Sequence, residues 1–133
     1  KKKIPVMGHI GRLPQYVSKF TLQGKNKNQK KNILEDAKTI SKSGVFAIVI
    51  ECVVESLAKK ITKSIPVPTI GIGASKYCDG QILVVNDILG LSDFFPKFVK
   101  KYSNLKKIID KSVKNYANDV KLKKFPTNKN VYR

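Results

Sequence analysis

The sequence has few of the residues that mark several common classes of protein. It contains two cysteines in 133 residues, Cys52 and Cys78, and they lie far apart with no CxxC motif. Only His9 could join them as an imidazole ligand. This scarcity excludes a disulfide framework and a zinc site, and it favours reduced thiols in a cytosolic setting.

Long hydrophobic runs are also missing. The longest apolar stretch, 45–54, is interrupted by Glu51, whereas a membrane-spanning helix needs roughly 20 apolar residues. No signal peptide is visible. We therefore expect no membrane span and a cytoplasmic location.

Charge is strongly one-sided, with 27 lysines and arginines against nine acids and a formal net charge of +18. Such a balance suggests nucleic acid or an anionic surface as a partner. However, only Arg12 and Arg133 are arginines, and the lysines are spread along the chain without interleaved aromatics. Because sequence-specific sites favour arginine, we expect no specific nucleic-acid partner. A basic nucleic-acid-binding module remains an alternative.

Acidic residues are too few to indicate a metal site. Asp79 and Asp87 offer carboxylate oxygens, but no acids are paired at a convincing spacing. The stretch 71–74, Gly-Ile-Gly-Ala, lacks the third glycine of a dinucleotide-binding motif, and a Walker pattern is absent. The residues alone therefore predict no metal or phosphate site in this segment.

What the sequence does contain is an alternation of strand and helix patterns. Apolar runs predict strands near 4–7, 45–50, 68–72 and 81–85. Helical spacing predicts helices over 32–42, from 54 to before Pro66, and from 105 to 120, the last capped by Ser103 or Asn104. We expect a glycine-flanked turn at 8–11 and a surface loop at 23–31. This order predicts an α/β fold with parallel strands, four of which make roughly half of an eightfold barrel.

Glu51 is the principal candidate for catalysis. It follows the apolar run 45–50, which fits a strand buried on both faces, and carboxyl ends of parallel strands carry the reacting groups of α/β enzymes. Apolar neighbours disfavour a charged carboxyl, which suits a general base near neutral pH. Alternatively, Glu51 begins the next helix, where an acid favours the positive end of the dipole.

His9 is the only histidine in the chain. A lone histidine is often a structural residue. Here Gly8 and Gly11 flank it and give other groups close access. A structural role and a ligand-binding role both remain open from the residues alone.

Many short motifs in register resemble the ketopantoate hydroxymethyltransferase family. The similarity extends from about residue 3 to about residue 126. Its motifs are 4–11 (Ile-Pro-Val-Met-Gly-His-Ile-Gly), Pro14-Gln15, Gln23-Gly24-Lys25, Leu34-Glu35-Asp36-Ala37, Glu51-Cys52-Val53, Ile65-Pro66, 71–74, 79–84 (Asp-Gly-Gln-Ile-Leu-Val), Asp87, Gly90 and Pro96-Lys97-Phe98.

The resemblance implies a (β/α)8 TIM barrel, of which this chain supplies roughly the C-terminal half. Residues 1–126 would belong to the single catalytic barrel domain, and 127–133 would form an irregular tail. The implied activity transfers a hydroxymethyl group from 5,10-methylenetetrahydrofolate to 3-methyl-2-oxobutanoate, giving 2-dehydropantoate in pantothenate and coenzyme A biosynthesis. Glu51 matches the family's proton acceptor, and His9 matches a histidine that lines the ketoacid site.

Further expectations follow from the same resemblance. Mg²⁺ would be bound by ligands in the N-terminal half, with none in this segment. Small-molecule ketoacid and folate would be the partners, and the full-length enzyme would be a homo-oligomer. The isolated 133 residues would be a catalytically incomplete, inactive fragment.

The chain departs from the family pattern at three places. The usual Gly-Leu-Thr-Pro-Gln is here Gly-Arg-Leu-Pro-Gln at 11–15, so that Arg12 and Leu13 replace a leucine and a threonine. Asn86 replaces a histidine before Asp87, and the acidic end of the family is replaced by 127–133. These changes affect the expected folate contacts and leave Glu51 in place.

Overall fold

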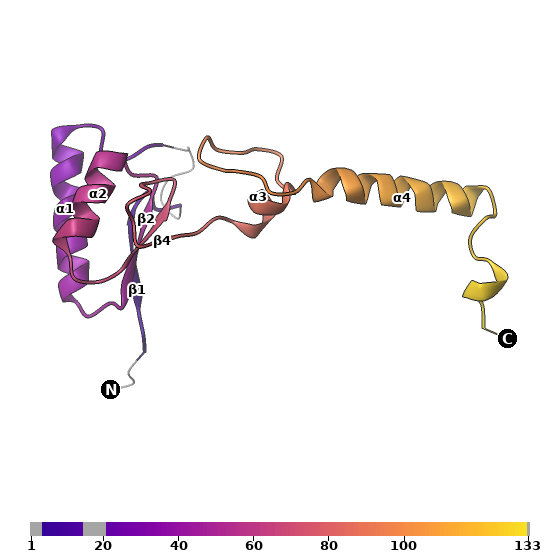
Figure 1. Cartoon of the computed structure of the whole chain (residues 1–133), viewed down its shortest axis with the longest axis horizontal. Helices are drawn as coiled ribbons and strands as arrows, with labels where there is room; N and C mark the ends of the chain where they lie inside the picture. The colour runs from indigo at the N-terminus through magenta and orange to yellow at the C-terminus, as the bar shows by residue number, and fades with distance from the viewer. Residues whose placement is uncertain (1–3, 15–20, 133) are drawn as a thin grey trace. The chain divides into compact units, whose positions relative to one another are not determined.

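The computed structural model describes residues 4–14 and 21–132 (Figure 1). Gln15 and Arg133, named above, lie outside the described residues, as does the start of the chain at 1–3. The chain forms two compact units, Lys1–Leu83 and Val84–Arg133, and each is described by itself.

The first unit contains a four-stranded sheet in the order β1-β2-β3-β4. The strands are β1 Met7–Gly11, β2 Ala47–Glu51, β3 Thr69–Ile72 and β4 Gly80–Gln81. All three neighbouring pairs are parallel, so the prediction of an α/β fold with parallel strands is confirmed. In the register, Gly11 lies opposite Glu51, and Glu51 lies opposite Ile72.

Two strand predictions had wrong limits. The strand expected at 4–7 is β1, Met7–Gly11, so the expected turn at 8–11 is part of the strand. Gly8 and Ile10 are buried and His9 between them is half-buried, which is the alternation typical of a strand. The expected strand 81–85 reduces to a short β4, and Val85 instead begins a helix. The N–H of Ile82 donates a hydrogen bond to the carbonyl of Gly71, and beyond this residue the chain leaves the sheet.

Two helices follow β1 and β2 along the chain. Helix α1 spans Lys27–Lys42 and α2 spans Glu55–Ser64. The second agrees with the prediction of a helix ending before Pro66. The first begins five residues earlier than expected, because Asn26 caps it by accepting a 2.8 Å hydrogen bond from Gln29 N–H. The predicted loop at 23–31 is therefore partly helical.

The core lies between the sheet and these helices. Figure 1 shows α1 and α2 together on one side of the sheet. Buried residues come from both layers: Ile10, Ile33, Ala37, Val45, Ile48, Ile50, Val53, Leu57, Ala58, Ile61 and Cys78. On the alternate positions, Val49, Glu51, Ile70 and Ile72 are only half-buried. The expectation that the 45–50 strand is buried on both faces is wrong for this chain, because the helices cover one face.

The second unit is helical. It contains α3 Val85–Leu89, α4 Leu105–Lys121 and a short 3-10 helix, η1 Asn128–Asn130. Asn104 caps α4, which confirms one of the two expected caps. Thr127 and Asn130 form a capping box at the start of η1. Within 4–14 and 21–132, no helix is long and apolar enough to cross a membrane.

Candidate active site

Glu51 is the last residue of β2, at the carboxyl end of a parallel strand. Helix α2 does not begin until Glu55, so the alternative that Glu51 starts a helix is wrong. The Glu51 side chain is 15% exposed. It lies on the sheet positions that alternate with the buried Ile48 and Ile50. Glu51 is therefore held in regular structure, on the sheet face that α1 and α2 leave uncovered.

The backbone around Glu51 is fixed by hydrogen bonds from three segments. Arg12 N–H donates to the Glu51 carbonyl at 2.8 Å, and Gln23 N–H donates to the Cys52 carbonyl at 2.7 Å. Cys52 N–H in turn donates to Ile72 at 2.9 Å. Because these hydrogen bonds restrain the backbone on both sides of β2, its carboxyl end gives the Glu51 side chain a rigid support.

Gly11 allows the first of these contacts. Its φ is +91°, and a Cβ there would lie 2.2 Å from the Glu51 carbonyl oxygen and 2.6 Å from Val53 Cγ2. Only glycine fits both the backbone conformation and the space. The chain can therefore pass directly over the end of β2 and bring Arg12 to Glu51.

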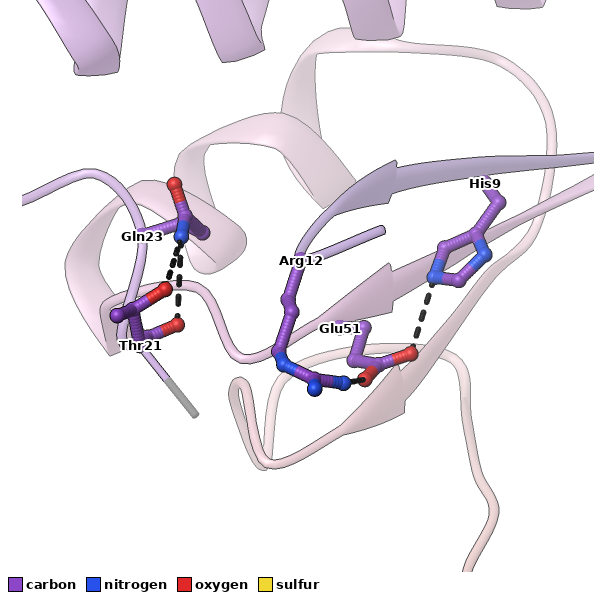
Figure 2. Close-up of polar contacts among 5 residues, drawn as sticks. All are labelled: His9, Arg12, Thr21, Gln23 and Glu51. Carbon is purple, nitrogen blue, oxygen red and sulfur yellow. Dashed lines mark hydrogen bonds and ion pairs between the residues drawn. The ribbon is translucent and has the colours of Figure 1, made fainter. Parts of the chain in front are cut away.

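Two basic side chains face the carboxylate of Glu51 (Figure 2). Arg12 Nη1 lies 3.1 Å from Oε1, and His9 Nε2 lies 3.2 Å from Oε2. Arg12 is 16% exposed and His9 31%. The expectation of apolar surroundings for Glu51 is thus wrong. Polar groups reach its carboxylate from β1 and from the residue after β1, and the residues next to Glu51 in the sequence do not reveal these contacts.

The two contacts differ in kind. Arg12 donates a hydrogen bond to Oε1. His9 Nε2 is close to Oε2 and buried, yet it makes no aligned hydrogen bond to any described residue. The 3.2 Å separation is therefore an ionic contact when the imidazole is protonated. Nε2 retains its capacity to bond a ligand atom placed beside Glu51.

Cys52, next to Glu51, is a buried thiol with a φ of +52°. Burial and, to a smaller extent, the charge of Glu51 raise the pKa of Cys52 to about 11, while the charge of Arg12 opposes the shift. The thiol is therefore protonated at neutral pH and is unsuited to act as a nucleophile.

These residues do not suit a magnesium ion. Among residues 4–14 and 21–132, no three histidine, cysteine or acidic side chains gather as metal ligands would. The carboxylate of Glu51 faces Arg12 and His9, and a guanidinium repels a cation. Asp79, the other candidate acid of this unit, accepts hydrogen bonds from the backbone N–H and hydroxyl of Thr69. No step involving Mg²⁺ is assigned to this chain.

The structure brings both predicted site residues, Glu51 and His9, together. It also adds Arg12, which in the sequence is only a departure from the family pattern. One signal could have found it: Arg12 follows Gly11 directly and is one of two arginines in a chain rich in lysine.

The parallel α/β sheet carries a carboxylate at its carboxyl edge, with an imidazole from the neighbouring strand beside it. This arrangement is typical of α/β proteins whose reactive groups lie at strand ends. Residues 1–128 match the family described as ketopantoate hydroxymethyltransferase, and the chain belongs to that family.

Its relatives carry the name 3-methyl-2-oxobutanoate hydroxymethyltransferase. The protein of Pelagibacter ubique is 52% identical over 132 residues, which cover 99% of this chain and 51% of that protein. That of Pseudothermotoga lettingae is 51% identical over 137 residues, covering 100% of this chain and 52% of the relative. The protein of Clostridium kluyveri is 55% identical over 130 residues, which cover 95% of this chain and 46% of that protein. The chain thus spans about half the length of these relatives.

Proposed function

We propose that this chain is the C-terminal half of a (β/α)8 barrel that transfers a hydroxymethyl group from 5,10-methylenetetrahydrofolate to 3-methyl-2-oxobutanoate. The names of the relatives and the half coverage support it. So does the sheet, whose helices lie on one face, as on the outside of a barrel. Its uncovered face, which carries His9 and Glu51, would then line the barrel interior.

The observation that carries the proposal is the contact between Glu51, the last residue of β2, and His9, in the middle of the adjacent parallel strand β1. Glu51 acts as general base and removes the proton from C3 of the ketoacid, which is acidic because the neighbouring carbonyl accepts the charge as an enolate. Water hydrolyses the two C–N bonds of the folate's methylene bridge, the folate nitrogens take up protons, and tetrahydrofolate leaves. The enolate carbon then forms a bond to the released formaldehyde carbon, and its oxygen takes a proton to become the hydroxyl of the product. His9, beside Oε2, contacts the bound ketoacid.

Other parts of the proposal lie outside the described residues. The magnesium ligands expected for the family would belong to the N-terminal half, and the step assigned to Glu51 does not involve them. We place the catalytic domain at 1–126, with 127–133 outside it. The protein would be a cytoplasmic homo-oligomer, a state that size-exclusion chromatography of the full-length protein would reveal.

The direct test uses the full-length protein, meaning this chain with the N-terminal half that the proposal requires. Incubated in D₂O with Mg²⁺ and 3-methyl-2-oxobutanoate, it should exchange the C3 hydrogen for deuterium, which NMR would follow. With the folate added, 2-dehydropantoate should form. The analogue 3,3-dimethyl-2-oxobutanoate, which has no C3 hydrogen, controls for exchange elsewhere. A folded full-length protein that catalyses neither reaction would refute the proposal.

A further inference from the structure

Arg12 is an unusual residue in this chain. Of 27 lysines and arginines, all but Arg12 and Arg133 are lysines. The arginine at position 12 is the residue whose guanidinium contacts Glu51. A guanidinium presents several donors in a fixed plane, whereas an ammonium is a compact point charge on a flexible stem. A site that needs a carboxylate held in one orientation favours arginine.

The position of Arg12 is fixed from both its backbone and its side chain. Its N–H donates to the carbonyl of Glu51 at 2.8 Å, and its Nη1 donates to the carboxylate of the same residue at 3.1 Å. Both side chains are largely buried, at 16% and 15% exposed, so solvent screens the pair less than it would a surface pair. Arg12 therefore restrains Glu51 at two points.

This contact divides the two carboxylate oxygens between different neighbours. Oε1 accepts a hydrogen bond from Arg12, whereas Oε2 faces His9 without an aligned hydrogen bond (Figure 2). The terminal torsion of a glutamate is broad and roughly two-fold. Without a partner on one oxygen, the carboxylate would sample orientations that exchange the two.

We propose that Arg12 is a positioning residue for the reaction: it holds Oε1 of Glu51, so that Oε2, beside His9, is the oxygen that takes the C3 proton. The inference rests on the proposed function, in which Glu51 is the base. Arg12 acts through Glu51 and need not touch the ketoacid. Its contribution is orientation, and misplacement of a reacting group by about 1 Å can cost up to about a hundredfold in rate.

The test measures C3 exchange of 3-methyl-2-oxobutanoate by full-length Arg12→Leu and Arg12→Lys proteins. Leucine fills the space of the stem without a charge, and we expect kcat to fall about tenfold while KM changes by less than about twofold. Lysine keeps the charge and should restore part of kcat. Circular dichroism checks that each variant folds. Lys31→Leu, which breaks the exposed 3.9 Å pair with Glu35, is the matched control and should leave the rate unchanged.

A double-mutant cycle separates positioning from a general structural effect. If Arg12 acts through Glu51, Arg12→Leu should not lower the residual exchange of Glu51→Gln further. An equal fall in both backgrounds would overturn the proposal, as would an unchanged kcat in both Arg12 variants. A raised KM with unchanged kcat would overturn it too, and would show that Arg12 binds the ketoacid instead. Wild-type exchange by Glu51→Gln alone would refute the proposed function itself, which is a distinct outcome.

Discussion

Replacement of Gly11 by alanine should be among the most damaging single-methyl changes in the described chain. The added Cβ would lie 2.2 Å from the Glu51 carbonyl oxygen, which is backbone and cannot rotate away, and 2.6 Å from Val53 Cγ2. The φ of +91° adds strain for any side chain. The substitution would therefore push the end of β1 away from Glu51.

Gly44 offers a matched control that separates the two costs. Its φ is +86°, but a Cβ there would meet nothing within 4 Å. Gly44→Ala should therefore cost only the backbone strain, about 1–2 kcal/mol. Gly11→Ala adds overpacking of about 1–3 kcal/mol, so its free energy of unfolding should fall by about 2–5 kcal/mol in total.

Urea unfolding of the full-length variants would measure both changes from the midpoint and slope. Gly11→Ala should also slow C3 exchange, because Arg12 and Glu51 move apart, whereas Gly44→Ala should exchange at the wild-type rate. Equal destabilisation by the two substitutions would refute the reasoning, since it would show that the close contact with Glu51 carries no energy.

Two further predictions concern titratable groups in the first unit. Hydrogen bonds from the backbone N–H and the hydroxyl of Thr69 hold the pKa of Asp79 below its usual 3.8, so this carboxylate stabilises the fold above about that pH and loses its effect as pH falls through the lower folded value. Asp79→Asn should therefore have a lower free energy of unfolding than wild type at neutral pH, and the difference should narrow below pH 3.8. A difference that does not change with pH in urea unfolding would contradict this. Burial raises the pKa of Cys52 to about 11, so iodoacetamide should label it slowly in the folded protein and rapidly in guanidinium, as mass spectrometry of the peptide would show. Fast labelling of the folded protein would contradict the buried position.

The sequence was sufficient to predict the features that depend on local pattern. The apolar run 45–50 with a terminal carboxylate predicted both β2 and the position of Glu51 at its carboxyl end. The spacing of Leu57, Ala58 and Ile61 predicted α2 and its buried face. Both elements show as local patterns of apolar residues, so residues near one another in the sequence are sufficient to predict them.

Features that depend on distant contacts were missed. Arg12 and Glu51 are 39 residues apart, and only the parallel register of β1 and β2 brings them together. The apolar residues next to Glu51 in the sequence therefore led to a wrong prediction of what surrounds its side chain. The start of α1 was missed for another reason: its first turns are lysine-rich and show no apolar period, and the capping by Asn26 was not recognised.

The central claim is that Glu51 takes the C3 proton, and one measurement tests it directly. Full-length Glu51→Gln keeps the shape of the side chain and an oxygen that can accept from Arg12, but its amide cannot take a proton. Exchange of the C3 hydrogen of 3-methyl-2-oxobutanoate in D₂O, followed by NMR without folate, should fall by about 10²–10⁴. Glu55→Gln, on the exposed first turn of α2, should exchange at the wild-type rate. If folded Glu51→Gln exchanged as fast as wild type, Glu51 would be a structural residue and the account would be contradicted.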